Sequence, residues 1–292
     1  MAKPFWRSIT RCSVVWAILL SFVGAAQGSD DIGKFTTLEA RAHSRIGVVA
    51  VDASRNRRVE YNARERFAMC STFKVLAAAA VLKRVDEKRD TLDRFVRYGE
   101  AQLLEYAPVT REHVKEGGMT LEALCAAALL QSDNTAGNLL LEAIGGPKGL
   151  TEFVRTLGDN VTRLDRMEPE LNLVAPGDER DTTTPAAMCQ DLERLFTSDV
   201  LTADSRTRLE DWMRANQTGL KMIRASVPAD WRVGDKTGRS GKGATNDIAI
   251  VRPPSGGPIF IAIYVVDQNE SQERRDDLVA EVARATIETL KK

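Results

Sequence analysis

The stretch from residue 247 to residue 266 reads DIAIVRPPSGGPIFIAIYVV and contains two apolar runs separated by a polar turn. The runs at 247–251 and 258–266 are rich in isoleucine and valine, whose branched side chains favour the pleated surface of a sheet. Prolines and glycines in the intervening RPPSGG provide the change of direction that a turn needs. This stretch therefore predicts two antiparallel strands joined as a hairpin.

Strand patterns occur at both ends of the chain, and helical patterns fill the middle. Three further strands are predicted at 46–51, 58–61 and 231–235. Helices are predicted at 31–44, 73–85, 120–130, 136–144, 148–157, 185–196, 205–216 and from 271 onward.

The order of these elements predicts an α/β fold of the α+β type. A five-stranded antiparallel sheet flanked by the terminal helices forms one lobe, from residues 29–66 and 217–292. An all-helical lobe spans residues 67–216. We expect the active site in the cleft between the two lobes.

The first 28 residues have the composition of a secretory signal. Lys3, Arg7 and Arg11 precede an apolar run at 12–26 that ends in small residues. A membrane anchor is the alternative, but the run is shorter than the roughly 20 residues that span a bilayer. We therefore expect residues 1–28 to be removed, leaving a secreted, periplasmic protein with no membrane attachment.

Composition argues against several kinds of function. The 41 basic residues balance the 41 acidic ones, and the pI is near 6.8. The chain therefore has no excess positive charge to attract nucleic acid. The two histidines, His43 and His113, lie far apart, and no paired histidine or cysteine motif indicates a metal site. The same scarcity of histidine argues against a Ser-His-Asp hydrolase.

Three of the four cysteines lie beyond the expected leader. Cys125 and Cys189 occur in apolar helical segments, where a free cysteine packs as a small hydrophobic residue. Together with Cys70 they make an odd number, so at most one disulfide bond can form and none is required.

Ser71-Thr72-Phe73-Lys74 stands at the start of the first long helix. A spacing of three places both polar side chains on one helical face, so the amine of Lys74 can reach the hydroxyl of Ser71. Such a lysine can be the base that makes a serine nucleophilic, and the helix N-terminus offers N–H groups to an oxyanion. Taken alone, the pattern equally fits a capping serine followed by a solvated lysine.

Two more short motifs fall where the cleft is expected. Ser-Asp-Asn at 132–134 follows an apolar helix, and Lys-Thr-Gly at 236–238 follows an apolar strand. Each also has a purely structural interpretation, the first as a helix-ending turn and the second as an edge strand protected by a charge. The three motifs in this order resemble those of the serine penicillin-recognising enzymes.

The segment from 163 to 183 narrows this resemblance. It reads RLDRMEPELN at 163–172 and PGDERDTT at 176–183, and it is similar to the omega loop, about residues 163–181, of class A β-lactamases. The resemblance extends over essentially the whole mature chain, and its motifs are most similar to those of broad-spectrum, cefotaxime-hydrolysing members. We expect an ion pair between Arg166 and Asp181 to clamp this loop.

The resemblance implies a hydrolase that opens the lactam amide of penicillins and cephalosporins and confers β-lactam resistance. Ser71 forms the acyl-enzyme, and Glu168 activates the water that hydrolyses it. Whether Lys74 or Glu168 is the base for acylation stays open. The implied catalytic residues are Ser71, Lys74, Ser132, Glu168 and Lys236. The implied substrate-binding residues are Tyr106, Asn134, Asn172, Thr237, Gly238, Arg239 and Arg275.

The remaining roles follow from the same resemblance. Ser132 relays a proton to the departing lactam nitrogen, and the backbone N–H groups of Ser71 and Arg239 form the oxyanion hole. Lys236 and Thr237 bind the substrate carboxylate. The resemblance implies no metal and no cofactor, a monomer, and small-molecule β-lactams as the partners.

Several positions depart from the commonest pattern of the family. Ser240 occupies the position of a cysteine that pairs with the one before the nucleophile in some relatives, so Cys70 is expected to be unbridged. Thr245 stands where many relatives have a carboxylate-binding arginine, a role that Arg275 is expected to take. Arg239 occupies a usually small position, and Met167 one that is usually bulkier.

Two other functions share the serine–lysine chemistry. A D-alanyl-D-alanine carboxypeptidase or transpeptidase is expected to lack Glu168 in this loop. A β-lactam sensor domain acylates without turnover and is normally tied to a membrane segment, which is not expected here after removal of the leader.

Overall fold

The computed structural model describes residue 1 and residues 29–292. The expected signal at 1–28 therefore lies almost wholly outside the described residues. Five strands form one antiparallel sheet in the order β2-β1-β9-β8-β7. Their bounds are β1 Arg45–Asp52, β2 Arg57–Tyr61, β7 Arg232–Arg239, β8 Ala244–Arg252 and β9 Ile259–Val266. The predicted fold class is confirmed.

The central strand β9 explains why the sheet has helices on both faces. Its successive side chains point to opposite faces, as in any strand. Ile259, Ile261 and Ile263 join the core beneath the sheet, whereas Phe260 and Tyr264 join the core above it. A strand that is apolar on both faces must be covered on both faces.

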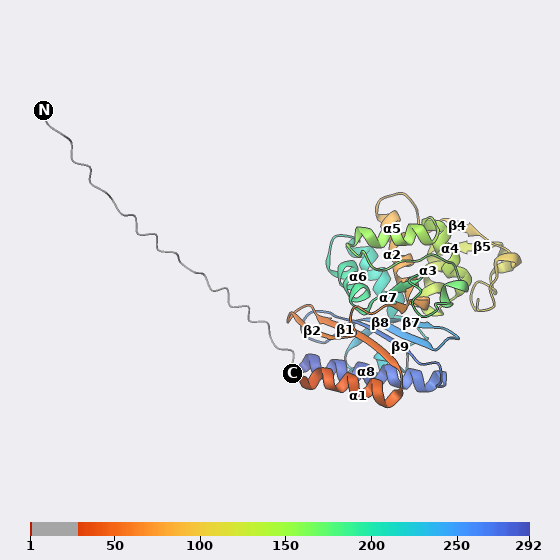
Figure 1. The fold of residues 1–292 in the computed structure, drawn as a ribbon. Coiled ribbons are helices and arrows are strands. Elements are labelled where there is room, and N and C mark those ends of the chain that lie inside the picture. Colours follow the sequence, from red (N-terminus) through yellow and green to blue (C-terminus); the bar gives the residue numbers. More distant parts are fainter. Residues whose placement is uncertain (2–28) are drawn as a thin grey trace.

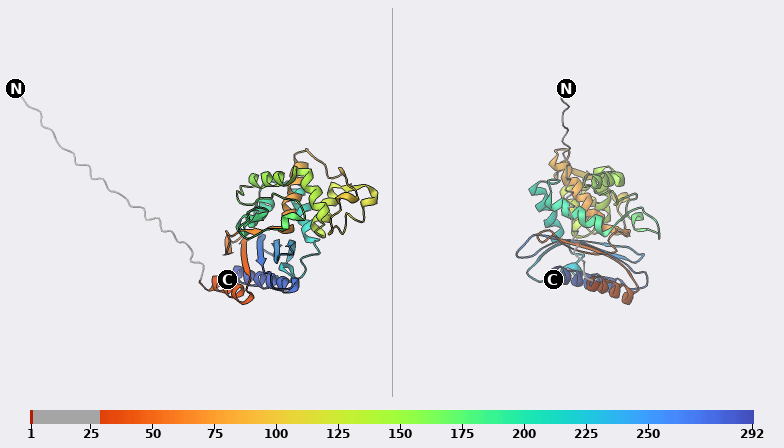
Figure 2. Two further views of the ribbon diagram at one scale, coloured as in Figure 1. Left: turned by 45° about the vertical axis from the view of Figure 1, so that its right-hand side comes forward. Right: turned by 60° about the vertical axis from the view of Figure 1, so that its left-hand side comes forward.

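Two helices cover the lower face of the sheet. These are α1 (Ser29–Ala42) and α8 (Gln272–Lys291), from the two ends of the described chain, and they lie side by side (Figure 1). Val279, Val282 and Ile287 of α8 keep helical spacing and are buried against the sheet. Figure 2 shows the sheet between this pair and the larger helical layer on its other face.

The upper layer is built around one buried helix. The bounds of its helices are α2 Phe73–Asp86, α3 Leu121–Leu130, α4 Asn134–Ile144, α5 Gly146–Thr156, α6 Pro185–Thr197 and α7 Ala203–Arg214. Every residue of α2 from Phe73 to Leu82 is buried, including Lys74, as expected for a helix surrounded by others. This helix begins immediately after Ser71, so the core of the layer fixes the position of that serine.

The structure differs from the sequence prediction mainly in the lengths of elements. β7 continues through residues 236–238 to Arg239, because these residues pair with β8 as the edge strand of the sheet. Two small two-stranded sheets are additional. They consist of β3 (Phe67–Ala68) with β6 (Thr182–Thr183), and of β4 (Phe95–Arg97) with β5 (Gly118–Thr120). Strands of two or three residues are too short to show a periodic pattern.

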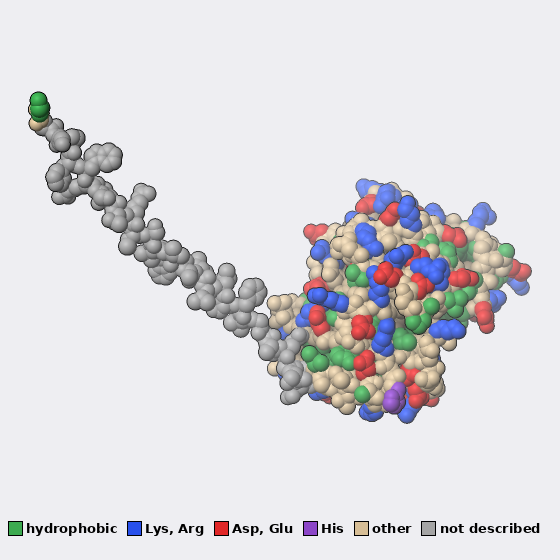
Figure 3. All heavy atoms as spheres, in the orientation of Figure 1, with side chains coloured by type: hydrophobic (Ala, Val, Ile, Leu, Met, Phe, Trp, Pro, Cys, Tyr) green, Lys and Arg blue, Asp and Glu red, His purple; other side chains and the backbone are tan. Residues whose placement is uncertain are grey.

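The surface and the helices agree with the composition. On the face drawn in Figure 3, basic and acidic side chains are interspersed, so that face shows no extended patch of one sign. No helix within residues 29–292 is long and apolar enough to cross a membrane.

Candidate active site

Ser71 lies in a single 3-10 turn, Cys70–Thr72, between β3 and α2. Cys70 has a φ of 46°, an unusual conformation for a residue with a side chain, and it turns the chain sharply before the serine. Asn246 of β8 holds this turn by donating to the carbonyl oxygens of Ala68 at 2.9 Å and Met69 at 3.2 Å. The sheet therefore supports the nucleophile from below.

Lys74 is fully buried, and its ammonium group lies at the centre of the site. Its Nζ donates to Ser71 Oγ at 2.9 Å, which confirms the contact predicted from their spacing. It also donates to Asn134 Oδ1 at 2.7 Å and to the carbonyl oxygen of Ser132 at 2.8 Å. Burial lowers the pKa of Lys74, and the neighbouring Glu168 carboxylate opposes that shift. The lowered pKa brings this amine closer to the range in which it can accept a proton.

The turn at 132–134 is fixed by the buried carboxylate of Asp133. This carboxylate caps α4 by accepting from Ala136 N at 2.8 Å. It also accepts from Thr110 N at 2.9 Å and Val109 N at 3.0 Å. Asp133 thus ties the loop after Tyr106 to the turn that carries the flanking polar side chains.

Lys236 approaches the same turn from the sheet. Its Nζ donates to Ser132 Oγ at 2.9 Å and to the carbonyl oxygen of Thr237 at 2.8 Å. Burial, reinforced by the charge of Lys74, holds the pKa of Lys236 well below its usual range, and the charge of Asp235 opposes the shift. Asp235 is itself anchored by Arg224 and Asn216, both at 2.5 Å.

Gly238 is required by the close approach of β7 to the nucleophile turn. A Cβ atom at this position would lie 2.7 Å from the carbonyl oxygen of Met69 and 3.2 Å from the Cβ of Cys70. Only a residue without a side chain allows this separation. Gly238 therefore acts through its size, and it does not line the cleft.

Glu168 reaches the site from the omega loop. Its Oε1 lies 3.4 Å from both Ser71 Oγ and Lys74 Nζ, and its Oε2 accepts from Asn172 Nδ2 at 2.6 Å. Asn138 of α4 holds the backbone of Glu168 with two hydrogen bonds of 2.9 Å, one to its N–H and one to its carbonyl oxygen. The carboxylate is therefore fixed beside the nucleophile.

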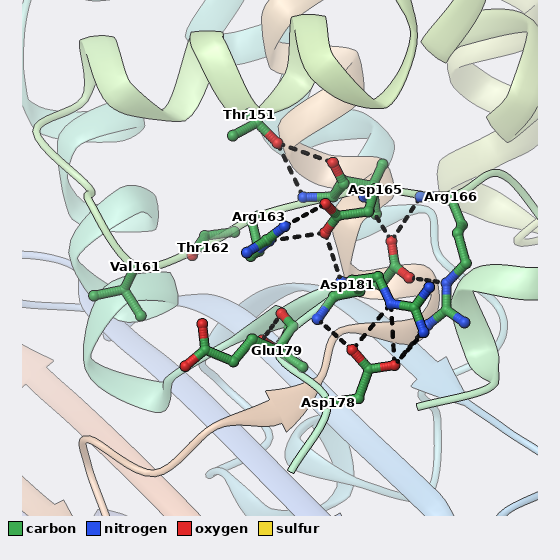
Figure 4. Close-up of polar contacts among 12 residues, drawn as sticks. Thr151, Val161, Thr162, Arg163, Asp165, Arg166, Asp178, Glu179 and Asp181 are labelled. Carbon is green, nitrogen blue, oxygen red and sulfur yellow. Dashed lines mark hydrogen bonds and ion pairs between the residues drawn. The ribbon is translucent and has the colours of Figure 1, made fainter. Parts of the chain in front are cut away.

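The two ends of the omega loop are joined through Asp181 (Figure 4). This fully buried carboxylate accepts from Arg166 Nε at 2.5 Å, which confirms the expected ion pair. It also accepts from the backbone N–H groups of Asp165 at 2.7 Å and Arg166 at 2.9 Å. Asp178, also labelled in Figure 4, forms a more exposed ion pair with Arg180 at 2.8 Å.

These groups surround a cleft of about 300 Å³ between β7 and the helical layer. Its walls are formed by Ser71, Tyr106, Ser132, Asn134, Asn172, Thr218, Thr237 and Arg239. Arg275 does not line it, because its guanidinium bonds to Thr245 and to its own loop at Asp267 and Glu270. The structure thus brings together the predicted site residues except Arg275, which lies outside the cleft.

The three cysteines of residues 29–292 are free and buried. Burial raises the pKa of Cys70 to about 12, so its thiol stays protonated and unreactive near neutral pH. No group of three or more His, Cys, Asp or Glu side chains in the described part of the chain could hold a metal ion.

Comparison with known protein families shows which family has this arrangement of residues. The family model for the β-lactamase enzyme family matches residues 32–290, nearly all of the described chain. The chain belongs to this β-lactamase family. It is a class A serine β-lactamase, a hydrolase that opens the amide of β-lactam antibiotics and so confers resistance to them.

Curated relatives and solved structures agree with the assignment. A β-lactamase of Amycolatopsis lactamdurans is 48% identical over 257 residues, covering 88% of this chain and 84% of the relative. CTX-M-8 of Citrobacter amalonaticus is 45% identical, covering 89% of each chain. The structure of the class A β-lactamase of the last common ancestor of Gram-negative bacteria is 53% identical with a TM-score of 0.87. That match covers 89% of this chain and 99% of the ancestral one.

Sequence reasoning missed two groups that shape the site of this β-lactamase. Asn138 positions Glu168, and its only sequence signal is its place one helical turn after Asn134. Thr218 lines the cleft and shares a 2.6 Å hydrogen bond with the hydroxyl of Thr237. No motif marks Thr218, because its partner lies on another element.

Proposed function

We propose that this β-lactamase hydrolyses penicillins and cephalosporins through an acyl-enzyme on Ser71. The hydroxyl proton of Ser71 passes to Lys74 or Glu168 as its Oγ attacks the lactam carbonyl carbon. The N–H groups of Ser71 and Arg239 stabilise the oxyanion. The C–N bond then breaks, and Ser132, which contacts Lys236 at 2.9 Å, delivers a proton to the lactam nitrogen.

Deacylation uses the other side of the site. Glu168 takes a proton from a water that attacks the ester carbonyl, and Asn172 helps to orient that water. The ester C–O bond breaks, Ser71 regains its proton, and the opened acid leaves. Asn134 and Thr237 contact the substrate in both steps, and Tyr106 lines the rim of the cleft.

One observation carries this proposal. Ser71 Oγ lies 2.9 Å from a buried lysine amine and 3.4 Å from a buried glutamate carboxylate, so one hydroxyl faces two groups able to accept its proton. A β-lactam sensor, which stays acylated, has no need of a carboxylate that activates water. The Glu168–Asn172 pair therefore favours turnover of the acyl-enzyme over long-lived acylation.

The proposal also includes the setting in which the enzyme works. Residues 1–28 are removed as a secretory signal, and the mature enzyme is a periplasmic monomer. Its two lobes are 29–66 with 217–292, and 67–216, with the omega loop at about 163–181. Intact mass of protein recovered from the periplasm tests the cleavage site, and light scattering tests the oligomeric state.

The function is tested by hydrolysis of a chromogenic cephalosporin with purified mature protein. We expect steady-state turnover, and complete loss of turnover in Ser71→Ala. A burst of one equivalent without further hydrolysis would instead indicate a β-lactam sensor. A panel of penicillins, oxyimino-cephalosporins and carbapenems then defines the substrate range.

The role of Glu168 is tested with Glu168→Ala. We expect this variant to accumulate an adduct on Ser71, visible as a mass increase of one opened β-lactam, while steady-state turnover falls at least about a hundredfold. Glu170→Ala is the matched control, because Glu170 is an exposed glutamate two residues further along the same loop. Rapid turnover by Glu168→Ala without an adduct would remove Glu168 from deacylation.

A further inference from the structure

Arg239 and Arg275 both lie near the Thr237 end of the cleft, but they form different hydrogen bonds. All three guanidinium nitrogens of Arg275 are engaged within the protein. Its Nε donates to Thr245 Oγ1 at 3.2 Å, its Nη2 to Gln272 Oε1 at 3.2 Å, and its Nη1 to the carbonyl oxygens of Asp267 and Glu270. Each nitrogen of this guanidinium therefore already has a partner within the protein, and Arg275 does not line the cleft.

Arg239 has one engaged side and one free nitrogen. Its Nη2 donates to Asp276 Oδ2 at 2.9 Å and to the carbonyl oxygen of Thr218 at 3.2 Å, and its Nε lies 3.4 Å from Asp276 Oδ1. Nη1 bonds to no other group of residues 29–292 and is not buried. Because Arg239 lines the cleft that contains Ser71, this nitrogen is available to a molecule bound there.

Asp276 is itself fixed by a second contact. Its Oδ1 accepts from Gln272 Nε2 at 2.7 Å, and the same Gln272 nitrogen donates to Thr245 Oγ1 at 3.1 Å. The first turn of α8 is thereby tied to β8. An arginine whose fork is held in this way loses little further side-chain entropy when it binds an anion.

We propose that Arg239, positioned by Asp276, supplies the guanidinium that pairs with the carboxylate of the β-lactam in place of Arg275. This inference rests on the proposed function. It names Arg239 as the residue that makes the enzyme prefer β-lactams with a free carboxylate. Lys236 is less suited to that contact, because its ammonium is buried and directed at Ser132 and the carbonyl oxygen of Thr237. Asp276 is a positioning residue, since it acts on the substrate only through Arg239.

The test compares a cephalosporin free acid with its carboxylate methyl ester. The wild-type enzyme is expected to prefer the acid. Arg239→Gln should lower kcat/KM for the acid about tenfold or more, mainly through KM, because a charge-assisted hydrogen bond is lost. The same variant should change kcat/KM for the ester by less than about twofold, since the ester carries no charge to pair.

Further variants separate the possible causes. Arg239→Lys should retain part of the preference for the acid, and Asp276→Asn should weaken it by loosening the guanidinium. Arg274→Gln is the matched control, because Arg274 is an exposed arginine one position from Arg275. It should leave both substrates unchanged.

Two outcomes would overturn the inference. Equal losses on acid and ester in Arg239→Gln would indicate a merely structural role for Arg239. Collapse of the preference in Arg275→Gln alone would assign the carboxylate to Arg275. Absence of turnover with both substrates in the wild-type enzyme would instead contradict the proposed function.

Discussion

Asp191 is a carboxyl group placed in the apolar core of the helical layer. It lies on α6, is completely buried, and neither of its oxygens has a hydrogen-bond partner in the described chain. Burial, reinforced by the nearby Asp159, holds the pKa of Asp191 well above its usual range. The folded protein therefore binds a proton here at pH values at which the unfolded chain has lost it.

This difference predicts how stability depends on pH. Well below about pH 4, the ordinary pKa of an aspartate, Asp191 is protonated in both the folded and the unfolded protein. As pH rises from there toward the raised pKa of the folded state, only the unfolded chain loses this proton, and the free energy of unfolding falls. Asp191→Asn mimics the protonated form. We expect it to stabilise the protein by about 1–3 kcal/mol at pH 7 and to have little effect at pH 4.

Urea unfolding of both proteins between pH 4 and pH 8 measures the effect. Asp199→Asn is the control, because Asp199 is exposed. A constant difference between wild type and Asp191→Asn across this range would contradict a proton bound at Asp191.

At the scale of single residues, the sequence could predict contacts only between side chains that are close together along one helix. Ser71 and Lys74 are one helical turn apart, so their contact follows from helix geometry alone. Whether Arg239 or Arg275 enters the cleft depends on Asp276 and on the loop after β9, which local spacing does not describe. The sequence accordingly predicted the contact between Ser71 and Lys74, but it could not show that Arg239 lines the cleft and Arg275 does not.

At the scale of elements, the omega loop depends on one buried carboxylate. Asp181 accepts three hydrogen bonds from residues at the beginning of the loop, so its removal leaves Arg166 and two backbone N–H groups without their partner. We expect Asp181→Ala to lower the free energy of unfolding by about 3–5 kcal/mol. It should also slow deacylation, because Glu168 is carried by the same loop.

Chemical unfolding and time-resolved mass spectrometry of the acyl-enzyme check these two effects. Arg180→Ala provides the control, since it breaks the exposed pair with Asp178 in the same loop and should change both quantities little. Equal behaviour of the two variants would show that the clamp is not what holds Glu168 in place.

For the whole molecule, the apolar runs predicted the sheet, whereas the lengths of its strands depended on pairing. The polar residues of the Lys-Thr-Gly motif become part of β7 only because β8 lies alongside to pair with them. The helices covering the sheet were predictable from their 3.6-residue spacing. The two small sheets depend on contacts between distant segments and left no pattern in the sequence.

The lower layer should affect stability without affecting chemistry. Phe35 of α1 is 1% exposed and stacks on Tyr61 of β2, on the face of the sheet opposite the cleft. We expect Phe35→Ala to lower the free energy of unfolding by about 3–5 kcal/mol through loss of apolar contact and the cavity that remains. Its kcat per folded molecule should match that of the wild type at 15 °C. A reduced kcat with normal stability would show instead that α1 acts on the site.

The pairing of β1 with β9 has a consequence for the order in which the protein can be made. Val48 of β1 lies opposite Ile263 of β9, so the central strand and one of its neighbours are far apart in the sequence. A ribosome must finish almost the entire polypeptide before the first strand meets its partner, and pairing of such distant segments is slow. Until β9 has been synthesised, the sheet lacks its central strand and cannot be completed. For the secretion proposed above, this arrangement would leave the chain time to cross a membrane before its sheet is complete.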